Sequence, residues 1–169
     1  MELSSLQKCD MLFDFYELAQ SAGFLADGTD ETVAWFDMFY RPSAELGGFC
    51  IMAGVRQFSE YIKNLTFSAE ELEFLRQKGL SEDFLAYLSD FKFSCDIWAV
   101  PEGTPIFANE PVVKVKGPVI QAQLLETIIL QSVNHQSLIA TKANRIVRAA
   151  QGREIIEFGS RRAHGISAA

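Results

Sequence analysis

The feature that most constrains the fold is a long helical run near the end of the chain, from Gln121 to Ala150. Its apolar residues recur three or four positions apart and therefore share one side of the helix. This apolar stripe consists of Leu124, Leu125, Ile128, Ile129 and Val133. Such a stripe is stable in water only when another element covers it, so the rest of the chain must supply a core. The polar group Asn134–Gln136 predicts a break into two helices, and Gly152 predicts the end of the run.

A single strand is expected after this run. Residues Glu154–Phe158 have the pattern of a buried strand, which closes on Gly159. One strand cannot complete a sheet, because its backbone needs neighbours to pair with. We therefore interpret residues 119–169 as a long helical connection and the first strand of an α/β barrel, truncated so that its remaining strands are not in this sequence.

Residues 1–118 predict an α+β N-terminal domain of helices and β hairpins. The expected helices cover residues 9–24, residues 54–64, the stretch between the capping box Ser68–Glu71 and Gly79, and Glu82–Ser89 after its cap Ser81. The expected strands are Thr32–Tyr40, its hairpin partner Phe49–Ala53, Cys95–Val100, Pro105–Phe107 and Val112–Val115. In the last of these, Val113 and Val115 alternate with lysines, as in a half-buried strand.

The β segments from Pro101 to Pro118 have the pattern of short strands and turns of a hammerhead-like region, which resembles lipoyl and biotinyl carrier domains. A carrier domain needs a lysine on an exposed hairpin tip, typically beside a methionine. No methionine follows Met52. A similar β topology without the swinging arm is therefore favoured over a carrier function.

The charge of the chain argues against nucleic acid as a partner. The formal net charge is −7, whereas a nucleic-acid binder needs a basic face that displaces counterions. The C-terminal part is locally basic, with two acids, Glu154 and Glu157, among the cations Lys142, Arg145, Arg148, Arg153, Arg161 and Arg162. A basic end on an acidic chain suits a small anionic ligand, although a solvated helix face is the simpler interpretation of Arg145 and Arg148.

The cysteines and the apolar runs indicate the cellular compartment of the protein. Cys9, Cys50 and Cys95 are widely spaced, so neither a disulfide framework nor a zinc site is expected, and a reducing cytoplasm fits them. No apolar run approaches the roughly 18 residues of a membrane span. Charged residues near the N-terminus argue against an export signal. We expect a cytoplasmic protein without membrane contact.

The candidate ligand site lies in the sequence Glu157–Gly165. There an aromatic residue and a glycine precede two adjacent arginines; these residues are Phe158, Gly159, Arg161 and Arg162. At the C-terminal end of a barrel strand they would face the mouth where ligands bind. Glycine lets the backbone approach a ligand closely, and arginine binds phosphate or carboxylate with paired donors. A surface turn that happens to hold two arginines is the simpler alternative for so short a pattern.

Further motifs precede this site in a fixed order. They are Asp14–Leu18, Phe36–Arg41, Val100–Thr104, Asn109–Pro111, Leu124–Thr127, Asn134–Gln136 and Ala140–Lys142. Each motif alone is weak. The ordered set, together with Glu157–Gly165, resembles the N-terminal portion of the nicotinate phosphoribosyltransferase family along nearly the whole chain.

The resemblance implies a reaction of NAD biosynthesis. The nicotinate nitrogen attacks the anomeric carbon of phosphoribosyl pyrophosphate with Mg²⁺, which gives nicotinate mononucleotide and pyrophosphate. Family members couple this step to ATP hydrolysis through a phosphorylated histidine. Neither His135 nor His164 stands where that histidine is expected, so the resemblance places no catalytic residue in this chain and implies that the chain alone is inactive.

The resemblance also implies roles for individual residues. Phe158 would stack on the pyridine ring, and Tyr16 would cover the other ring face from the second subunit of a homodimer with shared sites. Asp14 would help to position Tyr16 or the ring. Arg161 would hold anionic oxygens of the phosphoribosyl substrate, with Arg162 beside it. Arg41 would reach the phosphate groups, and Gly159 would let the backbone come close to the substrates.

Two alternatives remain open at this point. A quinolinate phosphoribosyltransferase shares the expected fold and would need additional cations around the ring, which this portion does not exclude. The chain is alternatively a non-catalytic structural or dimerisation segment, because the site is incomplete.

Overall fold

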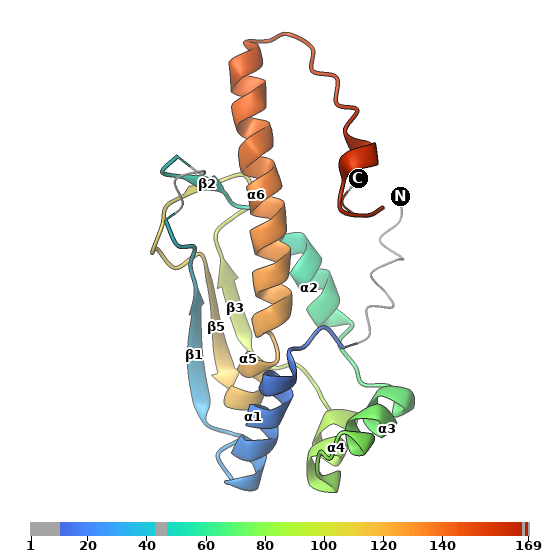
Figure 1. Cartoon of the computed structure of the whole chain (residues 1–169). Coiled ribbons are helices and arrows are strands. Elements are labelled where there is room, and N and C mark those ends of the chain that lie inside the picture. Colours follow the sequence, from blue (N-terminus) through green and yellow to red (C-terminus); the bar gives the residue numbers. More distant parts are fainter. Residues whose placement is uncertain (1–10, 43–46, 167, 169) are drawn as a thin grey trace.

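The computed structural model describes residues 11–42, 47–166 and 168. Helices and short strands follow one another in small groups along the chain, and the long helix α6 runs past the sheet and beyond it (Figure 1). The helices are α1 (Phe15–Ala26), α2 (Val55–Lys63), α3 (Ala69–Gln77), α4 (Glu82–Ser89), α5 (Val119–Gln123), α6 (Glu126–Ala150) and the 3-10 turn η3 (Ser160–Arg162). The strands are β1 (Val33–Met38), β2 (Cys50–Ile51), β3 (Asp96–Ala99), β4 (Pro105–Ile106) and β5 (Val113–Pro118). The fold is a mixed α and β arrangement with small open sheets, as predicted in outline.

The larger sheet has three antiparallel strands in the order β1-β5-β3. In the middle strand, Val115 lies opposite Phe36 of β1 and Ile97 of β3. Alternate residues of β5 are buried, which confirms the predicted half-buried strand. On the outer face, the ammonium group of Lys116 lies 4.7 Å from the centroid of the exposed Trp35 ring.

The predicted hairpin between the first two strands is wrong. β1 pairs with β5, and the short β2 pairs with β4. Helix α6 accounts for the difference, because its side chains bind the backbone around β2. The N–H of Ile51 donates to Thr141 Oγ1 (2.8 Å). The N–H of Ala53 donates to Ser137 Oγ (3.0 Å).

The helix caps predicted from the sequence are confirmed. Ser68 Oγ accepts a hydrogen bond from the Glu71 N–H, and the Glu71 carboxylate accepts one from the Ser68 N–H at 2.6 Å. Ser81 Oγ caps α4 by accepting from the Phe84 N–H. Helix α2 follows Gly54 as predicted. In each case the signal lies within one turn of the helix it begins.

Helix α1 begins later than predicted. Residues 11–14 are not helical, because Asp14 is extended and forms the N-cap. Residues 9 and 10, where the helix was expected to begin, lie outside the described part of the chain.

The break in the long helical run also lies elsewhere than predicted. The run is interrupted at Leu124 and Leu125, whose side chains are fully buried, and α6 continues through Asn134–Gln136. Asn134 and His135 are exposed. Polar side chains on the solvent side of a helix cost no buried hydrogen bonds, so they do not interrupt it.

The interior consists of two apolar clusters. One lies between the sheet, α2 and the first half of α6, and includes Met52, Phe58 and Ile128. The other joins α1, α3, α4 and α5 around Phe84 and Leu124. The first cluster depends on a close approach at the start of α2, where Gly54 has φ 102° and a Cβ atom would lie 2.4 Å from the Ser132 carbonyl oxygen.

The predicted buried strand over Glu154–Phe158 is not formed. These residues are exposed and carry neither helix nor strand. The reason is that no described strand lies beside them to pair with their backbone. In Figure 1 this segment descends from the end of α6 on the side away from the sheet. The barrel unit, the hammerhead-like region and the division at residue 118 stay predictions.

Candidate functional site

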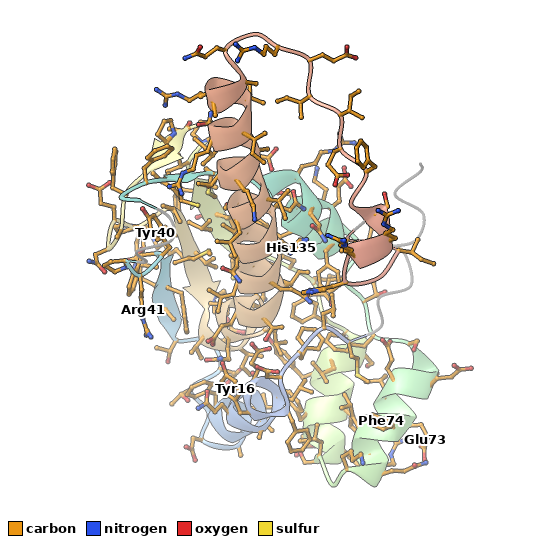
Figure 2. The ribbon with its side chains drawn as sticks, turned by 45° about the horizontal axis from the view of Figure 1, so that its top comes forward. Tyr16, Tyr40, Arg41, Glu73, Phe74 and His135 are labelled. Carbon is orange, nitrogen blue, oxygen red and sulfur yellow. The ribbon has the colours of Figure 1, made fainter. Side chains whose placement is uncertain are left out.

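The residues predicted to bind substrate lie in three separate places. Asp14 and Tyr16 stand at the beginning of α1, and Arg41 follows β1. The remaining four, Phe158, Gly159, Arg161 and Arg162, lie on the segment after α6. Figure 2 shows Tyr16 and Arg41 well apart. The structure of the single chain therefore does not bring them together.

The phenol of Tyr16 lies against the start of α6. Its hydroxyl is near the carboxylate of Glu126, whose Oε2 accepts a hydrogen bond from Gln123 Nε2 at 2.9 Å. Burial, and next the nearby Glu126 carboxylate, raises the pKa of Tyr16 to about 12. The side chain keeps 43% of its surface exposed. Tyr16 therefore offers an accessible ring with a neutral hydroxyl.

Glu17, the neighbour of Tyr16, was not among the residues predicted from the sequence. Its carboxylate is fully buried, and Oε1 accepts hydrogen bonds from the Thr127 N–H (3.0 Å) and the Thr127 hydroxyl (2.7 Å). Burial raises the pKa of Glu17, which the bonds to Thr127 partly oppose. A signal was present: Glu17, Leu18 and Ser21 share the buried side of α1, and a carboxylate there needs a partner.

Arg41 is exposed just beyond β1. The preceding residue, Tyr40, is anchored: its hydroxyl donates to the Ile106 carbonyl oxygen at 3.3 Å. Burial raises the pKa of Tyr40. The anchor fixes the backbone from which Arg41 projects, while the guanidinium group lies in solvent.

The segment after α6 presents its side chains to solvent. The Phe158 side chain is 74% exposed. Arg161 and Arg162 lie in η3, and their guanidinium groups form no hydrogen bond or ion pair with a described residue. Gly159 has φ −85°, a conformation open to any residue. A Cβ atom there would meet only the flexible Glu157 carboxylate, so no backbone demand for glycine is seen.

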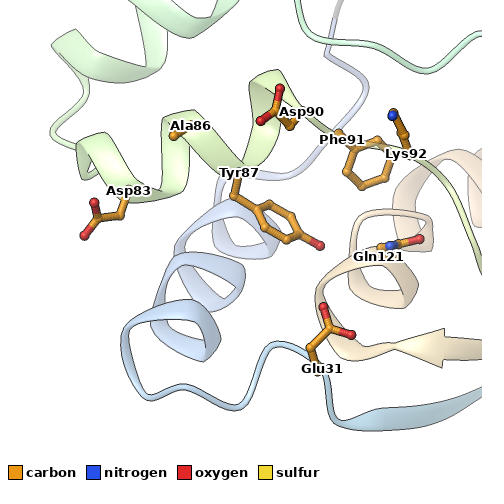
Figure 3. Close-up of a pocket in the computed structure, with 8 residues that line it drawn as sticks. All are labelled: Glu31, Asp83, Ala86, Tyr87, Asp90, Phe91, Lys92 and Gln121. Carbon is orange, nitrogen blue, oxygen red and sulfur yellow. The ribbon is translucent and has the colours of Figure 1, made fainter.

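A pocket of about 480 Å³ lies between α4, the loop before β1 and α5 (Figure 3). Its lining residues are Glu31, Asp83, Ala86, Tyr87, Asp90, Phe91, Lys92 and Gln121. None of the residues predicted to bind substrate is among them. Burial, and next the charge of Glu31, raises the pKa of Tyr87. Three carboxylates make this pocket unfavourable for a phosphate group.

Metal-ligand clusters and membrane-spanning helices are absent from the described residues. No three His, Cys, Asp or Glu side chains among them lie together as a metal-binding group. None of their helices has the length and apolar character to cross a bilayer.

The chain is similar to known proteins over most of its length. Residues 11–134 match the family model of the nicotinate phosphoribosyltransferase (NAPRTase) N-terminal domain. The nicotinate phosphoribosyltransferase pncB2 of Mycobacterium tuberculosis is 40% identical over 92% of this chain and 34% of its own length. The nicotinate phosphoribosyltransferase of Bacillus subtilis is 38% identical over 92% of this chain and 32% of its own. The chain thus spans about a third of the length of these relatives.

Solved structures agree with the sequence relatives. The crystal structure of human nicotinic acid phosphoribosyltransferase superposes with a TM-score of 0.81 at 30% identity, over 92% of this chain and 32% of that one. A nicotinate-nucleotide pyrophosphorylase from Pyrococcus furiosus has a TM-score of 0.65 at 21% identity, over 97% and 34% of the two chains, and shows the fold alone. With a family model that covers residues 11–134, the chain belongs to the nicotinate phosphoribosyltransferase family and corresponds to its N-terminal domain.

Proposed function

We propose that the chain acts as the N-terminal part of a cytoplasmic nicotinate phosphoribosyltransferase of NAD biosynthesis and is inactive alone. The observation that carries the proposal is the match of residues 11–134 to the family's N-terminal domain. In the reaction, the pyridine nitrogen of nicotinate forms a bond to the anomeric carbon of phosphoribosyl pyrophosphate. The bond from that carbon to the pyrophosphate oxygen breaks, and nicotinate mononucleotide and pyrophosphate result.

Two aromatic rings bind the nicotinate ring. Tyr16 contributes an exposed, neutral phenol, and Phe158 an unpacked ring that is 74% exposed. Stacking on a flat, electron-poor ring stabilises binding by about 0.5–1.5 kcal/mol per contact beyond burial. Asp14, directly before α1, positions Tyr16 or the ring.

The arginines bind the anionic substrate. Arg161 and Arg162 form no ion pair with a described residue, so both are free to bind phosphate oxygens with paired donors. Arg41 reaches the phosphate groups from a second place on the molecule. These charges stabilise the pyrophosphate as it leaves, without transfer of a proton. Gly159 lets the backbone approach the substrates.

No three His, Cys, Asp or Glu side chains gather among the described residues, and Mg²⁺ is commonly held largely by substrate phosphates and water. We therefore assign Mg²⁺ to the pyrophosphate substrate and derive no step through it. ATP is a co-substrate, and the histidine that carries its phosphate stands outside this chain. The exposed His135 and His164 have no part in that step.

Substrate sites are shared between the two subunits of a homodimer. The supporting observation is the separation of Tyr16 from the segment that bears Phe158 within one chain. A Tyr16→Ala enzyme and an Arg161→Ala enzyme, each strongly impaired, should regain roughly a quarter of wild-type activity when mixed and allowed random subunit exchange. Subunit exchange is verified with two different tags. Exchange without recovered activity would place both residues in one subunit's site.

The decisive experiment supplies labelled nicotinate, phosphoribosyl pyrophosphate, Mg²⁺ and ATP to two purified proteins. One is the 169-residue chain, and the other is the polypeptide extended through the reading frame that follows it. The extended protein should form nicotinate mononucleotide and the short chain should not. Product from the short chain would refute its inactivity. Conversion of quinolinate in place of nicotinate would assign the other phosphoribosyltransferase class, and no product from either protein would indicate a structural segment.

A further inference from the structure

Glu17 is a buried charged group on α1 that the proposed chemistry does not use. Its side chain has no exposed surface, and one oxygen accepts both hydrogen bonds from Thr127 described above. The other oxygen, Oε2, has no partner among the described residues. Burial of a carboxylate costs free energy, so the presence of Glu17 beside Tyr16 calls for a physical reason.

Glu17 accepts hydrogen bonds from donor groups at the beginning of α6. The first N–H groups of a helix have no acceptor within the helix itself. The N-cap of α6, Leu125, has no side chain that can accept a hydrogen bond. Glu17 supplies the acceptor for Thr127 from 110 residues earlier in the chain. The negative carboxylate also interacts favourably with the positive end of the helix dipole.

Two consecutive residues of α1 face two consecutive residues of α6. The Tyr16 hydroxyl lies near the Glu126 carboxylate, and Glu17 accepts a hydrogen bond from the Thr127 hydroxyl. Apolar contacts in the second cluster hold α1 against α5. The buried pair of Glu17 and Thr127 adds a directional polar contact that joins the first turns of α1 and α6.

We propose that Glu17 is a positioning residue that locks the first turn of α1 onto the first turn of α6 and thereby orients the Tyr16 ring for nicotinate. This role rests on the proposed function. Glu17 acts through Tyr16 and touches no substrate. Its loss should therefore affect nicotinate, which Tyr16 contacts, and leave phosphoribosyl pyrophosphate unaffected.

The chain offers a matched control in Glu102. Its Oε1 accepts hydrogen bonds from the N–H groups of Gly54 (2.7 Å) and Arg56 (3.3 Å) at the beginning of α2. Glu102 thus caps a helix from a distance, as Glu17 does. No residue proposed to bind substrate lies on α2. A comparison of the two carboxylates separates orientation of Tyr16 from helix capping in general.

The test measures the KM values for nicotinate and for phosphoribosyl pyrophosphate in the extended enzyme. Glu17→Leu should raise the KM for nicotinate by up to about tenfold, the size expected when the stacking of Tyr16 on the ring is lost, and leave the other KM within about twofold. Glu17→Gln should stay near wild type, because the amide oxygen accepts the same two bonds. Glu102→Leu should change neither KM. An unchanged KM for nicotinate in Glu17→Leu, or an equal rise in Glu102→Leu, would overturn the proposal.

A double mutant shows whether Glu17 acts through Tyr16. In the Tyr16→Ala background, Glu17→Leu should add no further rise in the KM for nicotinate. Fully additive effects would contradict the proposal. If Glu17→Leu does not fold, Thr127→Val decides, since it removes only the hydroxyl donor and should raise the KM about threefold.

Hydrogen exchange at the Thr127 amide tests the lock without enzyme activity. Exchange should be faster in Glu17→Leu than in wild type, because the amide loses its acceptor. Unchanged exchange would overturn the lock even in an active enzyme. A wild-type enzyme that forms no nicotinate mononucleotide would instead refute the proposed function, and the positioning role with it.

Discussion

The two halves of helix α6 carry similar apolar residues in different surroundings. In the first half, Ile128, Ile129 and Val133 are buried against the rest of the molecule. In the second half, Ile139 is 57% and Val147 59% exposed. Apolar periodicity thus predicts a helix, whereas burial requires a second element opposite the stripe. In the second half, β2 covers Thr141, but no described element covers the side that bears Ile139 and Val147.

The same contrast separates the two groups of proposed substrate contacts. Tyr16 belongs to the packed part, where the buried Glu17 and the second apolar cluster hold its helix. Phe158 and Arg161 belong to the exposed segment that follows α6. Substitutions in the packed part should therefore affect stability, and those in the exposed segment should affect substrate binding.

The largest effect is expected in the packed part. Phe58 is 1% exposed in the first apolar cluster, so Phe58→Ala should lower the free energy of unfolding by about 3–5 kcal/mol through lost burial and a cavity. The corresponding change in the exposed segment, Ile156→Ala, should alter the free energy of unfolding by less than about 0.5 kcal/mol. Urea unfolding of both variants measures the difference. Similar losses in both would show that the segment after α6 is packed in solution.

A smaller effect is expected for Arg161→Ala in the extended enzyme. Loss of a charge-assisted contact should reduce kcat/KM for phosphoribosyl pyrophosphate by a factor that corresponds to about 1.5–3 kcal/mol. The melting temperature should not change. Steady-state kinetics and thermal unfolding provide the measurements. Arg148→Ala, an exposed cation of α6 without a proposed role, is the control. Unchanged kinetics in Arg161→Ala would transfer the role to Arg162.

The buried carboxylate predicts a pH dependence of stability in the packed part. Burial raises the pKa of Glu17 in the folded chain above its unfolded value. The stability that this shift contributes is fully present below the unfolded pKa and is lost as pH rises through the folded pKa. Wild type should therefore lose stability relative to Glu17→Gln across that window. Urea unfolding from pH 4 upward tests it, and parallel pH profiles would contradict it.

The smallest effect is expected for Phe158→Ala. Stacking acts on the ring alone, so the KM for nicotinate should rise by an amount equivalent to about 0.5–1.5 kcal/mol, while the KM for phosphoribosyl pyrophosphate stays unchanged. Thermal stability should not change, because the side chain is exposed. Equal losses for both substrates would indicate that Phe158 holds the segment itself and not the ring.

The local features of the fold were predictable from the sequence, and the distant pairings were not. Ser68 and Ser81 cap the helices that they precede, because a cap and its helix lie within one turn. The partner of β1 was predicted wrongly, because no local signal distinguishes β5 from β2 as its neighbour. Among the candidate site residues, Tyr16 and Phe158 came from a resemblance in ordered motifs, and their roles stay predictions.

The sequence by itself determined the presence of the main helices, the caps of α3 and α4, the half-buried strand and the family, because each depends on residues close together in the chain or on motifs in order. Only the tertiary structure decided that β2 lies on α6, that Glu154–Phe158 forms no strand, and that Glu17 binds Thr127. A strand needs a neighbour for its backbone, and a buried carboxylate needs a donor. Both partners come from distant parts of the chain, and only folding brings them together.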